Sequence, residues 1–361
     1  MGESLDPSTS VVRPFRSRIV RAERAPAQVS PMFDALGSSQ AAERVWTSSP
    51  TDPDAYRPSA AGLYVYRLRR GHQEHVGVVG DVRAAAFAEG RVRGHEAVQE
   101  ARVDALVEHF TSGGPRSELV ALLHHAGPVE QAAVAHSVAS EPLVRFTSLD
   151  DWEQTVWRVP EHFDDDLVEE LAGAAYYIAD GHHRVAASLE VWQRAGRPAD
   201  AGVLCVLYPY DGLRLLSFHR RVAGPVDRDA VLGLLSEDFA VQPATGFDEP
   251  VGCFRMYLDG RWFDVDHTGA RPSGARGLDA AVLGDQVLDP LLRATGRRVE
   301  VTSALTPLDE LAKACDEDGG VLFALRPPPL EQLIEIADGG EVMPPKTTYF
   351  DPKPYAGIFL R

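Results

Sequence analysis

The chain has 361 residues, of which 44% are hydrophobic and 25% charged, and its formal net charge is −17 at pH 7. This length and composition are typical of one large globular domain or two smaller ones. The acidic charge argues against generic nucleic-acid binding, which needs a basic surface, although an acidic protein can still contain a small basic pocket. The three cysteines, none in CxxC spacing, argue against a structural zinc site and a disulfide framework.

The sequence gives no signal for a membrane location. The N-terminus lacks the apolar core of a signal peptide, and no run of about 18 apolar residues occurs. We therefore expect a cytoplasmic protein without membrane partners.

The first half of the chain predicts strands alternating with helices. After an irregular stretch rich in Pro, Ser and Ala (13–60), a hairpin is expected from Leu63–Leu68 and Glu74–Val79 through Arg70-Gly71. Apolar spacing then predicts helices over 96–110, 128–139 and 163–173 and strands over 119–123 and 154–159.

The second half predicts another hairpin and then a change of character. Residues 202–208 and 213–220 are expected to pair across Asp211-Gly212, a strong turn signal. From residue 226 onward a second α+β unit is expected, with helices over 229–238, 278–294 and 307–316, a hairpin around Asp259-Gly260 and a strand over 320–326. Prolines exclude a helix over 343–354.

A turn in the middle of the chain carries the clearest chemical signal. An apolar strand from Ala174 to Ala179 leads into it, and a helical stretch from Val185 to Trp192 follows. Between them lie Asp180, Gly181, His182, His183 and Arg184.

Such a strand–glycine–helix turn presents free backbone N–H groups and the positive end of the helix dipole at one point. His182, His183 and Arg184 put cations where a helix prefers anions, so we expect a bound phosphate to compensate for them. In the alternative interpretation, Asp180 or Gly181 caps the helix and the histidines lie on the surface.

Three weaker clusters carry further candidate residues. His95 and Glu96 form an acid/base or metal pair or belong to a solvated loop. His219 and Arg220 end an apolar strand, where ligands collect in α/β proteins, or form an exposed strand end. Lys346, Thr347 and Thr348 lie between proline clusters and suit a phosphate or carboxylate, although an ordinary polar loop would look the same.

Several of these motifs resemble those of a prokaryotic family known as a domain of unknown function. Residues 178–184 resemble its IADGHHR signature, and residues 343–353 (MPPKTTYFDPK) resemble its terminal MPPKSTYFYPK. Arg13-Pro14-Phe15, Gly94-His95-Glu96 and Phe218-His219-Arg220 resemble shorter elements in the same order. The family's APPYD element is reduced here to one Pro and Asp34, Ala97-Val98 replaces its Arg-Thr, and Val185 replaces its Tyr.

The turn also resembles that of the ParB/sulfiredoxin-like superfamily, which includes kinases of free serine. This resemblance implies an α/β (α+β) fold with a ParB/sulfiredoxin-like nucleotide-binding core and a second, smaller α+β unit. The expected boundaries are 1–225 for the core with its N-terminal extension, 226–330 for the smaller unit, and 331–361 for a C-terminal segment that returns to the site. The implied ligands are ATP or ADP with Mg²⁺ and a small-molecule substrate, and a homodimer is one expected assembly.

The leading hypothesis is a nucleotide-dependent phosphotransferase acting on a small hydroxylated metabolite such as free serine. Residues 180–184 would bind the nucleotide phosphates, Glu96, His182, His183 and Arg184 would act in catalysis, and Asp180 would contact Mg²⁺. His95, His219, Arg220, Lys346, Thr347 and Thr348 would bind the substrate.

Two other classes of function remain open at this point. A nucleotide-binding switch would use the same turn without turning over a metabolite. A metal-dependent hydrolase or lyase would instead use His95, Glu96, His182, His183 and His219 as metal ligands.

Overall fold

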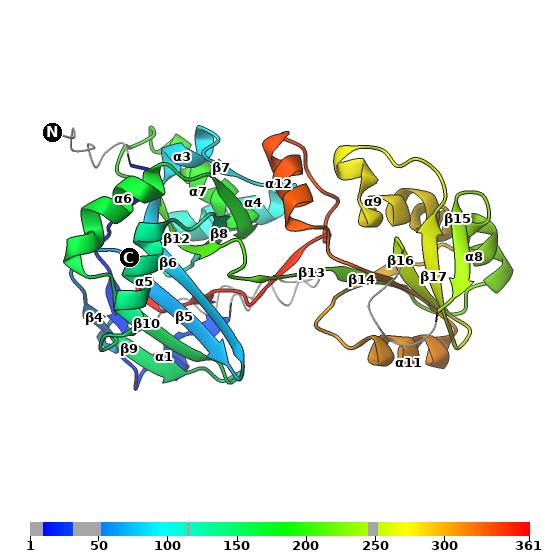
Figure 1. The fold of residues 1–361 in the computed structure, drawn as a ribbon, viewed down its shortest axis with the longest axis horizontal. Coiled ribbons are helices and arrows are strands. Elements are labelled where there is room, and N and C mark those ends of the chain that lie inside the picture. Colours follow the sequence, from blue (N-terminus) through cyan, green and yellow to red (C-terminus); the bar gives the residue numbers. More distant parts are fainter. Residues whose placement is uncertain (1–9, 32–51, 114–115, 245–251) are drawn as a thin grey trace. The chain divides into compact units, whose positions relative to one another are not determined.

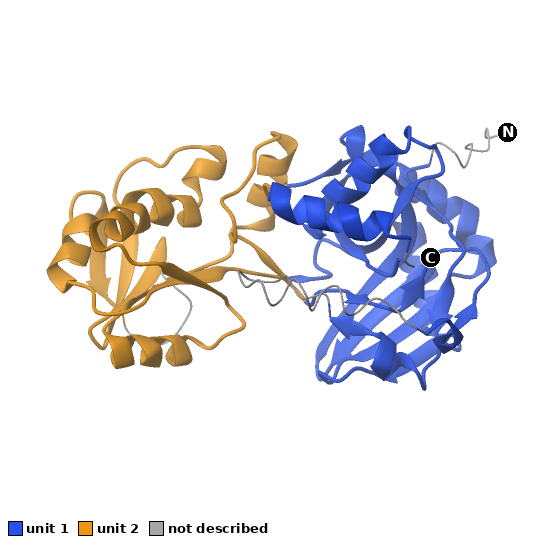
Figure 2. Cartoon of the chain, turned by 180° about the vertical axis from the view of Figure 1, so that it is seen from behind, with its two compact units in different colours: residues 1–94, 98–214, 352–361 blue, residues 95–97, 215–351 orange. Residues whose placement is uncertain are grey.

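The computed structural model describes residues 10–31, 52–113, 116–244 and 252–361. The chain forms two compact units, coloured separately in Figure 2. Unit 1 contains residues 1–94, 98–214 and 352–361, and unit 2 contains residues 95–97 and 215–351. Both units mix helices with sheets, so the predicted α/β class is confirmed (Figure 1). The boundaries expected at 225 and 330 stay predictions.

Unit 1 is built on a mixed nine-stranded sheet in the order β7-β11-β8-β12-β6-β5-β10-β9, with β1 beside β6. These strands are β1 (Val12–Arg13), β5 (Tyr64–Arg70), β6 (Gln73–Arg83), β7 (Val92–Arg93), β8 (Val120–His124), β9 (Val144–Thr147), β10 (Glu153–Arg158), β11 (Tyr176–Asp180) and β12 (Gly202–Pro209). The pairs β8–β12 and β7–β11 are parallel and the other pairs are antiparallel. The predicted hairpin through Arg70-Gly71 is confirmed as β5–β6.

Helices of unit 1 pack their apolar residues against this sheet. The helices are α1 (Ala25–Gln28), α3 (Ala84–Ala88), α4 (Glu100–Thr111), α5 (Pro128–Val138), α6 (Asp164–Ala172) and α7 (His182–Arg194). Phe87 of α3, Ala133 of α5, Leu171 of α6 and Val185 of α7 belong to one core with strand residues such as Trp157. Burial of this apolar surface is the main force that holds the layers together.

Short strands from both ends of the chain complete unit 1. The strand β2 (Arg18–Val20) lies between β22 (Phe359–Leu360) and β4 (Tyr56–Pro58), and β3 (Ser30–Pro31) pairs with β21 (Tyr355–Ala356). The segment 352–361 is therefore fixed in unit 1 by backbone hydrogen bonds, and this fixes the position of Lys353 within the unit.

Unit 2 contains an antiparallel six-stranded sheet in the order β15-β17-β16-β19-β14-β18. The strands are β14 (Phe218–Val222), β15 (Phe239–Pro243), β16 (Phe254–Leu258), β17 (Arg261–His267), β18 (Val299–Ser303) and β19 (Val321–Leu325). The helices are α8 (Arg228–Leu235), α9 (Asp279–Leu283), α10 (Asp289–Thr295), α11 (Leu308–Asp318) and α12 (Leu330–Asp338), with a π-helical turn between α9 and α10. Residues of α8, α9 and α10 pack on one face of the sheet and α11 packs on the other (Figure 1).

The hairpin predicted across Asp211-Gly212 is wrong. The turn itself forms, since the Gly212 N–H donates to the Pro209 carbonyl at 2.7 Å. However, β6 and β8 occupy both edges of β12, so no edge is left for the next strand. The chain instead continues into β13 (Arg214–Leu216), which pairs with β20 (Tyr349–Asp351), and into β14.

Candidate functional site

The strand–turn–helix predicted at residues 180–184 is present in unit 1. The pairing of β11 with β8 is irregular between Ile178 and Asp180, and α7 begins at His182. Gly181 is the N-cap residue and has φ 108°, which an L-residue rarely adopts. A Cβ atom there would lie 2.9 Å from Nη2 of Arg184 and 3.1 Å from Cγ2 of Val120. Glycine is thus required by both the backbone and the packing.

Asp180 is the centre of a buried ion-pair group in this turn. Its Oδ2 pairs with Arg184 and its Oδ1 with Lys353, and all three side chains are nearly buried. Burial raises the pKa of Asp180, but the neighbouring Lys353 and Arg184 outweigh burial and lower the pKa to about 2. The carboxylate is therefore ionised at neutral pH, and the three groups together carry one net positive charge.

This geometry corrects the electrostatic argument made from the sequence. Arg184 does not depend on a bound anion for compensation, because it pairs with Asp180 and donates to the Leu119 carbonyl at 2.8 Å. The second cation beside Asp180 is Lys353, which lies 173 residues further along the chain.

The two histidines of the turn have different surroundings. His182 is buried, and its Cδ2 would lie 3.0 Å from a Cβ atom placed on Gly94. His183 accepts a hydrogen bond through Nε2 from the backbone N–H of Gln99, the N-cap residue of α4, at 3.0 Å. His183 therefore connects the start of α7 to the start of α4, with its proton on Nδ1.

The magnesium role predicted for Asp180 competes with the two ion pairs of its carboxylate. Both oxygens of its carboxylate already contact cations, so a metal ion would have to displace Lys353 or Arg184. In the parts of the chain that the structure describes, no three His, Cys, Asp or Glu side chains come together as metal ligands. The Asp180 carboxylate as it stands does not fit a magnesium ligand.

In unit 2, Arg220 is a buried cation held by backbone carbonyls. It is 8% exposed and donates to the carbonyls of Phe218 (3.2 Å), His219 (3.4 Å), Pro345 (3.3 Å) and Lys346 (2.8 Å). Burial lowers its pKa to about 10, so it stays charged at neutral pH. Among the described residues, no carboxylate lies within ion-pair distance of it. A buried guanidinium without a counterion is costly, which makes this position attractive to an anion.

Other predicted residues of unit 2 lie in the C-terminal motif at residues 343–348 or contact it. Lys346 has a positive φ of 61°, and its Nζ lies 5.3 Å from the centre of the Phe218 ring. Thr347 donates to the Pro344 carbonyl at 2.7 Å, and Thr348 contacts Nε2 of His95 at 3.0 Å.

Glu96 is attached to this motif through the backbone. It forms an isolated parallel bridge with Met343, and the Met343 N–H donates to the His95 carbonyl at 2.7 Å. The structure therefore brings His95, Glu96, Arg220 and the 343–348 motif together in unit 2.

His219 is expected to make stability depend on pH. Its Nδ1 accepts from the Leu325 N–H at 3.3 Å, and burial, together with Arg220, lowers its pKa from 6.5 to about 4. The folded state thus resists protonation, so its stability is fully present above pH 6.5 and falls as the pH drops toward 4. At about 1.4 kcal/mol per pH unit, the loss in the free energy of unfolding should reach about 3 kcal/mol by pH 4. Urea unfolding from pH 7.5 to 4 measures it.

A matched variant tests this assignment. In His219→Asn the side-chain oxygen can still accept from Leu325, but it does not titrate. The loss of stability between pH 6.5 and 4 should shrink by most of the about 3 kcal/mol expected for the native chain. An unchanged pH profile would show that other groups cause the loss.

A family model described as "Protein of unknown function (DUF1015)" matches residues 56–283. The chain belongs to this family. The match includes the 180–184 turn, Glu96 and Arg220, whereas Lys346 and Lys353 lie outside it. No curated protein matches the chain.

Solved structures similar to this DUF1015 chain include a mutant free serine kinase in complex with AMP, which is 18% identical over 75% of this chain and 86% of that one, with a TM-score of 0.41. SbnI from Staphylococcus aureus, with a C-terminal truncation, is 11% identical over 77% and 85%, with a TM-score of 0.41. A conserved hypothetical protein from Pyrococcus furiosus is 17% identical over 78% and 93%, with a TM-score of 0.38.

Lys353 is the residue of this DUF1015 chain that the sequence analysis missed. It is the last residue of the terminal motif at residues 343–353. Its position between Pro352 and Pro354, at the end of a motif with few other cations, was the available signal. Asp34, the remainder of the APPYD element, lies outside the described residues.

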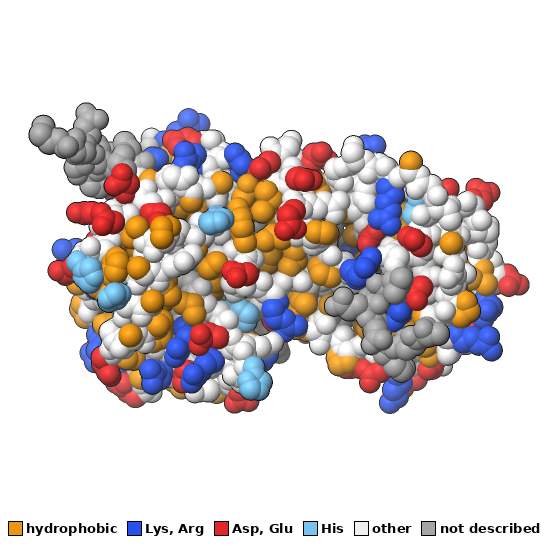
Figure 3. All heavy atoms as spheres, viewed as in Figure 1, with side chains coloured by type: hydrophobic (Ala, Val, Ile, Leu, Met, Phe, Trp, Pro, Cys, Tyr) orange, Lys and Arg blue, Asp and Glu red, His pale blue; other side chains and the backbone are white. Residues whose placement is uncertain are grey.

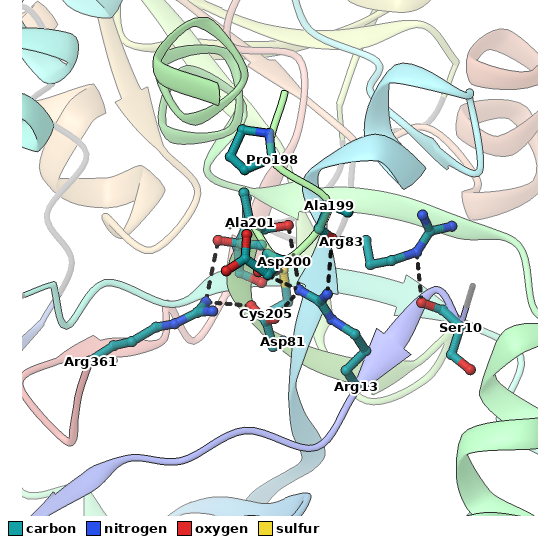
Figure 4. Close-up of polar contacts among 12 residues, drawn as sticks. Ser10, Arg13, Asp81, Arg83, Pro198, Ala199, Asp200, Ala201, Cys205 and Arg361 are labelled. Atoms are coloured by element: carbon teal, nitrogen blue, oxygen red, sulfur yellow. Dashed lines mark hydrogen bonds and ion pairs between the residues drawn. The ribbon is translucent and has the colours of Figure 1, made fainter. Parts of the chain in front are cut away.

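The opening Arg13-Pro14-Phe15 element of the DUF1015 chain has a structural role in unit 1. Arg13 pairs with Asp81 and donates to the carbonyls of residues 199–201, and Arg361 pairs with the same carboxylate (Figure 4). Phe15 packs edge-on against Tyr64. These contacts attach both ends of the chain to the central sheet.

The surface of the DUF1015 chain has mixed charge on the face shown in Figure 3, where acidic side chains are scattered among basic ones. Of the residues described, none form a helix long and apolar enough to cross a membrane.

Proposed function

We propose that this chain is a nucleotide-dependent phosphotransferase that acts on a small hydroxylated metabolite, such as free serine or a related hydroxy amino acid. The observation that carries the proposal is the Asp180–Arg184 turn. There the N-terminus of a 13-residue helix lies beside two cations, Arg184 and Lys353, that Asp180 holds in place. Backbone N–H groups, the helix dipole and a fixed cation together favour the phosphates of ATP or ADP.

The scaffold of the turn supports this role by preorganisation. Asp180 holds Lys353 and Arg184 in place, so the cations lose little freedom when an anion arrives. His182 is the histidine assigned to the transferred phosphate, because His183 is engaged by the α4 N-terminus. Positioning and electrostatic stabilisation carry most of catalysis in phosphoryl transfer.

The acceptor side of the proposal rests on unit 2. Arg220 would bind the acceptor's carboxylate, since its planar guanidinium suits two oxygens at once. Lys346, Thr347, Thr348, His95 and His219 would supply further donors. Glu96 is the proposed base that takes the proton from the acceptor's hydroxyl.

Magnesium enters the proposal with the nucleotide. Mg²⁺ keeps most of its waters and needs few protein carboxylates, so the ion can be carried by the phosphates themselves. This assignment leaves the pairs of Asp180 with Lys353 and Arg184 intact.

The test is phosphate transfer from ATP or ADP, with Mg²⁺, to L-serine, L-threonine and L-homoserine. We expect turnover of at least one acceptor. In Glu96→Gln, kcat should fall about 100-fold or more while nucleotide affinity stays within twofold, because the amide cannot take a proton. Val98→Ala, a change at a nearby exposed position, is the control and should keep full activity.

Other results would separate the alternatives. Nucleotide binding without transfer to any acceptor would favour a nucleotide-binding switch, and no nucleotide binding at all would rule out the proposal.

A further inference from the structure

A groove in unit 2 shares only Thr347 with the proposed acceptor site. Its volume is about 320 Å³, and its walls come from Arg271, from residues 277–280, from residues 325–329, from Gln332 of α12 and from Thr347. This volume is at the small end of the range for ligand pockets, about 300–1,000 Å³, and suits a small metabolite rather than a nucleotide.

The charged groups of the groove give it a net positive charge in an acidic protein. Arg271 and Arg326 are positive, and Asp279 is the one carboxylate in the lining. Asp279 is already paired with Arg271. Arg326 donates to the Gly252 carbonyl, and among the described residues no carboxylate lies within ion-pair distance of it. Among the described residues, Arg326 is therefore the lining cation without an ion pair.

One wall of the groove is rigid. Pro327, Pro328 and Pro329 fix the backbone after β19 and offer ring surfaces without N–H donors. The side-chain donors of the lining are Arg271, Arg326, Gln332 and Thr347, none of them from the proline wall. A ligand that binds there meets apolar rings and a fixed guanidinium, and little conformational freedom of the wall is lost.

The groove and Arg220 are connected through β19 and the C-terminal motif of unit 2. Arg220 stands opposite Phe323 in the pairing of β14 with β19, so the two side chains share one face of the sheet. Leu325, which lines the groove, is two residues beyond Phe323 and lies in the same core. Arg220 also donates to the carbonyl of Lys346, the neighbour of the lining residue Thr347.

We propose that this groove selects the substrate by binding a small carboxylic acid, with Arg326 as the cation that pairs with the carboxylate. Gln332 and the proline wall limit the size and polarity of the rest of the ligand. The inference rests on the proposed function in one respect, which is that the bound acid is the phosphate acceptor. The groove itself is a feature of unit 2 and can be tested without a nucleotide.

The experiment measures binding of L-serine, L-glutamate and succinate to the full chain by isothermal titration calorimetry, without nucleotide. Erythritol serves as the uncharged probe. At least one acid should bind with a millimolar or tighter dissociation constant, and erythritol should not. Arg326→Gln should weaken the binding of that acid tenfold or more.

The matched control is Arg293→Gln, which removes an exposed arginine from α10 of the same unit and should leave binding unchanged. Ala280→Leu fills the groove without changing charge and should also weaken binding tenfold, which keeps the test valid if Arg326→Gln does not fold. Absence of binding for all three acids, or equal effects of Arg326→Gln and Arg293→Gln, would overturn the inference.

The outcomes separate this inference from the proposed function. Acid binding that depends on Arg326, without phosphate transfer, supports the groove and counts against the phosphotransferase. Phosphate transfer with a KM for the acceptor that Arg326→Gln leaves unchanged supports the phosphotransferase and overturns the groove assignment.

Discussion

Replacing Lys353 with methionine is expected to destabilise unit 1 and to weaken nucleotide binding. The substitution keeps the length and apolar stem of the side chain but removes the charge that pairs with Oδ1 of Asp180. Breaking one of the two pairs leaves a buried carboxylate partly uncompensated, which should cost about 3 kcal/mol. Nucleotide affinity should fall at least tenfold, because a fixed positive charge beside the start of α7 is lost. Urea unfolding and calorimetry with ADP measure the two effects.

The acid dependence of the same variant provides a second readout. In the native chain the lowered pKa of Asp180 gives stability that is present above pH 3.8 and is lost as the pH falls toward about 2. Without Lys353 the pKa of Asp180 should rise, so this acid-dependent part should shrink. Lys313→Met, at an exposed position on α11, is the control and should change neither stability nor binding appreciably. If both variants behave alike, Lys353 has no special role.

Replacing Gly181 with alanine should have the second large effect. The residue has φ 108°, and the new Cβ atom would lie 2.9 Å from Nη2 of Arg184 and 3.1 Å from Cγ2 of Val120. Backbone strain costs about 1–2 kcal/mol, and displacing the buried Arg184 adds to it, so we expect a total loss of about 3 kcal/mol. Nucleotide affinity should fall as well, since the start of α7 must move.

Gly196→Ala is the matched control for this effect. Gly196 also has a positive φ, 82°, but nothing lies within 4 Å of a Cβ atom placed there. It should lose only the strain energy, about 1 kcal/mol. The difference between the two variants in urea unfolding isolates the close approach to Arg184. Equal losses would show that Gly181 is needed for its backbone angle alone.

Elements with strong local signals could be predicted from the sequence. The hairpins at Gly71 and Asp259-Gly260 form as expected, because a turn residue between two apolar runs brings adjacent strands together. The same signal failed at Asp211-Gly212, where the neighbouring strand had no free edge. The helix α12 was not predicted, although Leu330, Leu333, Ile334 and Ala337 follow helical spacing.

The candidate site likewise has a part that could be predicted from the sequence and a part that could not. The sequence by itself determined the turn at residues 180–184, because a strand, a glycine and a helix follow one another directly and each depends on nearby residues. Only the tertiary structure decided that Asp180 pairs with Lys353 and with Arg184, and that Arg220 is buried among carbonyls, with no carboxylate of the described residues beside it. These contacts join residues far apart in the chain, and whether a charge is paired or left uncompensated depends on what the folded chain places beside it.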